Sequence, residues 1–358
     1  QDGELLISGS GIRNLVLILN LVVQISEQQV PMSNQRSLSG TLGLGDVIIF
    51  VFANIIGSGV YKKIAPMADG LQSSAWILIA WAAAGVITLF GALSNAELAG
   101  MLADTGGEFV YLKKIYNRFF SFLYGWSLFT VIQTATIASL AYVFTQSLNS
   151  IVPLPELFSD WQNATVGGVF FPFRESGIKL TAILLIMSLT LLNMSGLKSG
   201  ARVNKFLFFL VCAGLTVIVI TGLANSSQNP SEMVNLKNLK GGSVTVSSFL
   251  TAMLAAFWAY QGWASTGFIG GEIKDVRRNL PRGIIIGVSA ITIIYVLVNY
   301  SYLAVMSIPE LVRVHEAGNQ VAAIEMVRSI GASGGVLFIS LLILVSTLGC
   351  LNASILTG

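Results

Sequence analysis

The sequence predicts an all-α integral membrane protein, and three observations lead to that prediction. The chain has 358 residues, of which 54% are hydrophobic and only 10% are charged, whereas a typical soluble domain is about 25% charged. Its mean hydropathy is +0.76. The apolar residues form blocks of about 20 residues, the length that a helix needs to cross a bilayer. Because unpaired backbone groups are costly in lipid, each block is expected to be helical.

About eight such blocks follow one another along the chain. They cover residues 44–65, 75–101, 119–149, 178–194, 203–224, 245–271, 283–306 and 334–357. The segment before the first block and the short loops after blocks two, four and six carry eleven Lys and Arg residues, against eight in the longer remaining loops. Since cytoplasmic loops are enriched in basic residues, we expect a multi-pass protein of the cell (cytoplasmic) membrane, with the N-terminal side in the cytoplasm.

The two ends of the chain differ from the spans between them. Residues 1–40 begin without Met and include the short apolar stretch Ile12 to Ile25, which cannot span a bilayer. This stretch could lie on the membrane surface, belong to a signal sequence, or be translated upstream of a true start at Met32. We divide the chain into this N-terminal segment, partly non-native or cytoplasmic, and a transmembrane domain over 41–358. That domain stops at an apolar block, which predicts an incomplete set of spans.

Several classes of function are excluded by missing motifs. The sequence contains no P-loop lysine motif, no metal-ligand cluster, no catalytic triad pattern and no potassium-channel filter. Cys212 and Cys350 lie in apolar blocks and are interpreted as small packing residues. The basic residues are dispersed rather than gathered in a patch, so no nucleic-acid partner is expected. The sequence therefore predicts neither an enzyme nor an ATP-driven pump, and it predicts no cofactor or metal.

The first span contains Gly57, Ser58 and Gly59 near its middle. Glycine costs about 1 kcal/mol relative to Ala in a helix interior. One interpretation is close helix packing at small residues. The functional interpretation is a broken helix, whose freed amides and positive dipole end would bind a carboxylate, as transporters do near the bilayer midplane.

The sixth span contains a second interruption, at Gln261 and Gly262 between aromatic residues. Freed carbonyls here would accept hydrogen bonds from an ammonium group, and Trp258 would close over the site. The alternative is an aromatic packing seam with a tolerated glycine. Interruptions five spans apart are typical of the inverted repeats of secondary transporters.

Charged residues near the predicted cytoplasmic ends of the spans are few. Glu97 stands near the end of span two, and Glu272 follows span six together with Lys274 and Arg278. Charges within spans are functional by default, but a solvated role is an equal alternative at the interface. We predict that these four residues form a cytoplasmic ion-pair network that steadies one gating state.

At this point a family resemblance is evident. The stretches that carry it are Gly43–Tyr61, Ala92–Tyr111, Phe122–Ala138, Asn193–Lys205, Phe257–Pro281 and Ser346–Ile355. In these stretches the sequence resembles the amino acid–polyamine–organocation superfamily, most closely its bacterial L-type amino acid permeases. The resemblance implies a LeuT-like fold with two inverted five-helix repeats, and about eight of about twelve expected spans are present.

The resemblance also implies a substrate site at the two breaks. A carboxylate would meet the amides of Ser58 and Gly59, and Trp258 would be the outer gate. An ammonium would meet carbonyls near Ile55 and at Trp258, Ala259 and Gln261. Side chains of spans three and eight would shape the rest of the pocket. The residues implicated in substrate binding are Asn54, Ile55, Gly57, Ser58, Gly59, Trp258, Ala259, Gln261 and Gly262.

A coupling ion, H⁺ or Na⁺, is possible by the same resemblance. The candidate ion-site residues are Ala53, Ile56, Ser346, Thr347 and Asn352, although helix packing is an equal explanation for those of span eight. Many relatives carry a lysine within span five near the ion. Val211 stands at that place here, and Lys205 lies about one and a half turns earlier, which leaves sodium coupling and exchange open.

These observations predict a secondary transporter that moves L-amino acids by alternating access. One alternative is a polyamine or other amine carrier of the same superfamily, which would need acidic pocket residues, and none stand out in spans one, three or six. Another is a nonfunctional truncated membrane protein. The expected partners are a small-molecule substrate and the lipid bilayer, and a protein partner remains open.

Overall fold

A computed structural model describes residues 40–102, 106–149, 151–167, 171–194, 197–227, 236, 243–317, 321–332 and 334–357. The regular structure of these residues is helical, apart from isolated bridge residues such as the pair Leu42 and Ile273. Met32 and the rest of residues 1–39 lie outside the described part, so the prediction of a start at Met32 stays a prediction.

Six continuous helices of the described chain are long and apolar enough to cross a membrane. They are α5 (Ser74–Met101), the run of α7 (Arg118–Ser127), η2 (Leu128–Ile132) and α8 (Gln133–Asn149), then α9 (Ser176–Met194), α10 (Leu197–Ala224), α13 (Val276–Val305) and α16 (Gly335–Thr357). They correspond to the predicted spans two to five, seven and eight. The chain is therefore a multi-pass membrane protein.

The two remaining predicted spans are each in pieces, which is why neither counts as a continuous crossing helix. The first consists of α2 (Leu44–Ile55), α3 (Gly59–Lys62) and α4 (Ile64–Leu71). The sixth consists of α12 (Val246–Tyr260) and the 3₁₀ helix η4 (Trp263–Glu272). Shorter helices lie in the connections: α6 (Glu108–Ile115), η3 (Ser159–Trp161), α14 (Ile308–Glu316) and α15 (Ala322–Ser329).

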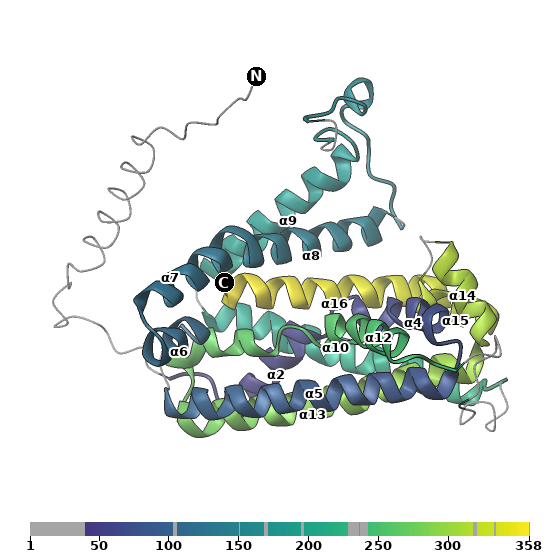
Figure 1. Ribbon diagram of the computed structural model, residues 1–358. Helices are drawn as coiled ribbons and strands as arrows, with labels where there is room; N and C mark the ends of the chain where they lie inside the picture. Colours follow the sequence, from purple (N-terminus) through teal and green to yellow (C-terminus); the bar gives the residue numbers. More distant parts are fainter. Residues whose placement is uncertain are drawn as a thin grey trace, which may run out of the picture. The chain divides into compact units, whose positions relative to one another are not determined.

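The larger of two hydrophobic clusters packs both broken helices against α5 and α13, which run side by side (Figure 1). Small residues allow the close approach of α13 to α2. A Cβ atom on Gly283 would lie 2.3 Å from Val47, and one on Gly287 would lie 2.6 Å from Val51. Small residues at helix interfaces are typical of packing within membranes.

A second, smaller cluster joins α8, α9 and α16 through Ala141, Ala182, Leu189 and Leu351. Helix α16 also contacts α2 and α10, so it connects the two clusters, and Figure 1 shows it running beside α8. Helix α16 contacts both interrupted spans, through α2 and η4.

Backbone hydrogen bonds join the start of the first interrupted span to the end of the sixth. The amide of Thr41 donates to the carbonyl of Glu272 at 2.8 Å, and the amide of Lys274 donates to the carbonyl of Leu42 at 2.9 Å. A Cβ on Gly40 would lie 3.0 Å from the Ile273 carbonyl oxygen. The residues that precede α2 are therefore hydrogen-bonded to those at the end of η4.

Candidate functional site

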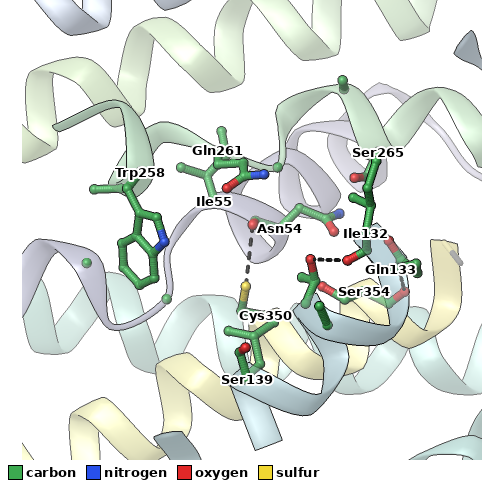
Figure 2. A pocket seen from close by; sticks show the side chains of 18 of the residues that line it. Asn54, Ile55, Ile132, Gln133, Ser139, Trp258, Gln261, Ser265, Cys350 and Ser354 are labelled. Atoms are coloured by element: carbon green, nitrogen blue, oxygen red, sulfur yellow. Dashed lines mark hydrogen bonds between the residues drawn. The ribbon is translucent and has the colours of Figure 1, made fainter. Parts of the chain in front are cut away.

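A cavity of about 440 Å³ lies at the two breaks. Its walls come from both broken helices and from α6, α7, η2, α8 and α16. Figure 2 shows the side chains of the two breaks opposite those of α8 and α16. The cavity lining includes every residue predicted to bind substrate: Asn54, Ile55, Gly57, Ser58, Gly59, Trp258, Ala259, Gln261 and Gly262.

The first break separates Ile55, the last residue of α2, from Gly59, the first of α3. The first amides of a helix have no acceptor within that helix, so the amides that start α3 are available to a ligand. Lys63 keeps helical dihedral angles of φ −74° and ψ −14° between α3 and α4, so the second half of the span continues as a helix. A Cβ on Gly59 would lie 2.8 Å from the Ala259 Cβ, so the two broken helices touch here.

The second break turns at Gly262, which has φ +117° and ψ −17°. This positive φ favours glycine, since a side chain is strained in that region. A Cβ at this position would also lie 2.3 Å from the carbonyl oxygen of Asn54. Backbone conformation and the close approach of the first broken helix thus both require glycine at this position.

Two hydroxyl groups hold the carbonyls that the breaks release. The buried hydroxyl of Tyr295, on α13, lies 3.3 Å from the Ile55 carbonyl oxygen and 3.1 Å from that of Ala259. The hydroxyl of Ser346, on α16, lies 3.0 Å from both carbonyl oxygens of Ile56 and Gly57. Such partners offset the cost of burying backbone groups outside a regular helix.

The predicted ammonium contact at Ile55 faces competition. The Ile55 carbonyl accepts from the amide of Gly57 at 2.9 Å as well as from Tyr295. A carbonyl oxygen has two lone pairs, so both are engaged. Of the two carbonyls that Tyr295 contacts, that of Ala259 is the stronger candidate for an added donor, and Tyr295 would hold it in place.

Trp258, the predicted gate, is 50% exposed and stands at one rim of the cavity. Its side chain and that of Gln261 also line a groove on the outer face of α5 and α12. The ammonium nitrogen of Lys63 lies 4.2 Å from the centre of the Trp258 ring, a cation–π contact. Trp258 therefore lines both the cavity and this groove, and its role as a gate stays a prediction.

Several cavity residues were not predicted individually from the sequence. On α8 these include Gln133 and Ser139, and on α16 they include Cys350 and Ser354. The Gln133 amide donates to the Ser354 carbonyl at 2.6 Å and joins the two helices (Figure 2). The signal was the spacing of polar side chains: Ser346, Cys350 and Ser354 recur every four residues, which places them on one face of a helix.

Cys350 packs more specifically than its apolar block indicated. It is buried and its thiol donates to the Asn54 carbonyl at 3.4 Å, a bond shown in Figure 2. Cys212 is half-buried, and neither cysteine forms a disulfide bond.

The predicted ion-site residues separate into three groups. Ala53, Ile56 and Ser346 line a small cavity of about 20 Å³, which Val211 also lines. The Thr347 hydroxyl instead donates within its own helix, to Ile343 at 2.7 Å. The remaining residue, Asn352, does not line this cavity, but it bonds Asn204, which does.

Asn352 donates to the Asn204 side-chain oxygen at 2.7 Å and accepts from Asn193 at 3.1 Å. These bonds connect α16 to α9 and α10. Within the described residues, no direct salt bridge joins the four predicted cytoplasmic partners, Glu97, Glu272, Lys274 and Arg278.

The sequence matches the amino acid permease family over residues 42–357. The chain belongs to this family. The permease is 29% identical to the serine/threonine exchanger SteT of Bacillus subtilis, over 91% of this chain and 68% of the exchanger. It is 30% identical to the b(0,+)-type amino acid transporter 1 of Oryctolagus cuniculus, over 77% of this chain and 54% of that protein. The large neutral amino acids transporter small subunit 2 of Homo sapiens is 29% identical, over 90% of this chain and 57% of that protein.

A solved structure has the same fold. Mhp1, a nucleobase–cation symport transporter in a closed conformation, superposes with a TM-score of 0.55 at 15% identity, over 90% of this chain and 67% of Mhp1. This similarity confirms the LeuT-like fold that the sequence predicts. The permease spans about half to two thirds of the length of these proteins. All of them are transporters, which agrees with the prediction that the chain is not an enzyme.

Proposed function

We propose that this permease is a secondary transporter that moves L-amino acids across the cell membrane by alternating access. The single observation that carries the proposal is the cavity in which both breaks meet. One cavity of about 440 Å³ is large enough for a free amino acid, and every residue predicted to bind the substrate lines it. The similarity to serine/threonine and other amino acid transporters supports the same substrate class.

The substrate would lie with its two charged ends on different helices. Its carboxylate would accept from the amides of Ser58 and Gly59, where the helix dipole of the second half-helix favours negative charge. Its ammonium would donate to the carbonyl of Ala259. Because the two contacts are on separate helices, a substrate binds best when the helices are at one particular separation, and this differential binding shifts the conformational equilibrium.

The coupling ion and the orientation belong to the same proposal. A sodium ion at the small cavity would have the carbonyl oxygens of Ile56 and Gly57 and the hydroxyl of Ser346 within reach, and unwound carbonyls are ligands of Na⁺ in transporters. The small cavity and the two bonds of Ser346 support this site. The loop charges support an N-terminal side in the cytoplasm.

Thermal stabilisation of the purified protein in lipid nanodiscs tests the proposal. We would measure its melting temperature with each of the twenty L-amino acids, with their carboxamides and with polyamines. A ligand at 100 times its Kd adds about 2.7 kcal/mol to the folded state, so a subset of L-amino acids is expected to raise the melting temperature and their carboxamides are not. Stabilisation by polyamines alone would transfer the function to an amine carrier, and no stabilisation by any L-amino acid would contradict the proposal.

A further inference from the structure

The central cavity contains a carboxylate that the carboxylate–ammonium scheme does not use. Among the described residues that line the cavity, Glu108 is the one with a charged side chain, and no Lys, Arg or His side chain lines it. Sequence reasoning missed this residue because it lies in α6, between spans two and three, and not within a span.

Contacts of the neighbouring backbone place Glu108 at a defined end of the cavity. A Cβ on Gly107 would lie 3.2 Å from the carbonyl carbon of Gly267 and 3.3 Å from the amide of Phe268. The first residue of α6 therefore lies at the η4 end of the cavity, which Ser265 and Phe268 also line. Figure 2 shows Ser265 and the predicted gate Trp258 on opposite sides of the view.

One oxygen of Glu108 has a partner already. The hydroxyl of Tyr124, on α7, donates to Oε2 of Glu108, and both side chains are partly buried and line the cavity. An ionised carboxylate has two acceptor oxygens, so Oε1 can take a further donor or cation.

The charge of an occupied cavity decides what that donor is. An amino acid with a neutral side chain is a zwitterion with no net charge, so its binding displaces water and leaves the charge of Glu108 uncompensated. Burying an unpaired charge is costly, within a membrane protein especially. A single positive charge beside Glu108 would make the occupied cavity electrically neutral.

We propose that Glu108 and Tyr124 form a cation subsite, which holds one monovalent positive charge when the cavity is occupied. Two sources have this chemistry: the ammonium or guanidinium side chain of a cationic amino acid, or a sodium ion that binds together with a neutral one. The subsite rests on the proposed function, since it describes the same cavity.

Equilibrium binding to the protein in nanodiscs tests the subsite and separates the two sources. L-Lysine, L-arginine, L-serine and L-leucine would each be titrated in sodium chloride and in N-methyl-D-glucamine chloride. The variants are Glu108→Gln and, as the matched control, Glu316→Gln, which removes the same charge from an exposed position at the end of α14.

If the substrate supplies the charge, Glu108→Gln weakens the binding of L-lysine and L-arginine at least about tenfold. The affinity for the neutral amino acids stays unchanged. If sodium supplies it, Glu108→Gln weakens the sodium dependence of L-serine and L-leucine binding, and the dependence that remains is that of the sodium site at Ser346. Glu316→Gln behaves as wild type in every arm. Tyr124→Phe, which keeps the charge, weakens the same ligands about threefold and serves as a second variant if Glu108→Gln does not fold.

Unchanged binding of all four ligands in both salts by Glu108→Gln, or by Tyr124→Phe if that variant alone folds, overturns the subsite and leaves the proposed function intact. Failure of wild-type protein to bind any amino acid overturns both.

Discussion

Both breaks contain glycine, but Gly57 of the first and Gly262 of the second have different roles. At the first break the backbone stays in regions that most residues can adopt: Ile56 has φ −80° and Ser58 has φ −79°. At the second break Gly262 has φ +117°. The same residue type therefore marks an unwound but ordinary backbone in span one and a left-handed turn in span six.

The space around Gly57 and Gly262 differs as well. A Cβ on Gly57 would meet Cys350 Sγ at 3.6 Å, an ordinary contact, whereas one on Gly262 would be 2.3 Å from the Asn54 carbonyl oxygen. Gly57 leaves room for a ligand, whereas Gly262 allows the other broken helix to approach. A glycine in an interrupted span therefore does not by itself indicate whether it makes room for a ligand or for a neighbouring helix.

The hydroxyl groups of Ser346 and Tyr295 differ in how many of the breaks they bond. Ser346 bonds carbonyls of the first break alone, while Tyr295 bonds one carbonyl of each. Loss of Tyr295 should therefore loosen both breaks together, and loss of Ser346 should loosen one.

The largest effect is expected from Gly262→Ala, which tests the demand for glycine at the second break. The added Cβ meets the Asn54 carbonyl and the left-handed backbone is strained, so we expect a loss of about 3 kcal/mol of stability. The measurement is the melting temperature in detergent. Gly70→Ala is the matched control, because a Cβ there meets nothing within 4 Å. Equal melting temperatures for the two variants would refute the requirement.

Tyr295→Phe tests whether one hydroxyl couples the breaks. Two buried carbonyls lose a donor, so we expect about 2 kcal/mol lower stability and weaker substrate binding. Tyr302→Phe is the control on the same helix: this hydroxyl is also buried, and it has no hydrogen-bond partner in the described part of the chain. If Tyr302→Phe weakens binding as much as Tyr295→Phe does, the coupling role is wrong.

Ser346→Ala sharpens the contrast by removing support from the first break alone. We expect a loss of about 1 kcal/mol, together with weaker stimulation of binding by sodium, measured by titration with substrate at several sodium concentrations. Thr347→Val is the matched control, since this hydroxyl bonds carbonyls of its own helix. Sodium stimulation that Ser346→Ala leaves intact would exclude Ser346 from the ion site.

The smallest effect on stability is expected from Gly57→Ala. The methyl group fits against Cys350 and Leu140, so the melting temperature should change little, by about 0.5 kcal/mol or less in stability. Because the methyl group projects into the lining of the cavity, affinity for large amino acids should fall up to about tenfold relative to small ones. A marked loss of stability would mean that Gly57, like Gly262, is required by the fold.

Much of the architecture could be predicted because its causes are local. Apolar blocks of span length predict the helices wherever they lie, and the glycines of residues 57–59 and Gly262 predict where two of them break. All nine predicted binding residues line one cavity for the same reason, since they flank those breaks directly. Their roles stay predictions.

The remaining residues of the site were less accessible from the sequence. Glu108 lies in a short helix that no span contains, and Tyr295 lies within an otherwise ordinary apolar helix. The ion-site prediction grouped Ser346 with Thr347 and Asn352 because they are close in sequence, but their side chains leave α16 in different directions and bond different neighbours.

The sequence by itself determined that this chain is a helical membrane protein, where its spans lie and which two of them are interrupted, because hydropathy and helix propensity act along the chain. Only the tertiary structure decided that Tyr295 reaches Ile55 across 240 positions of sequence, that Gly262 fits against Asn54, and that Glu108 is a charged group in the cavity. These contacts depend on which helices pack together and how they are rotated, and close packing of many side chains at once sets that geometry.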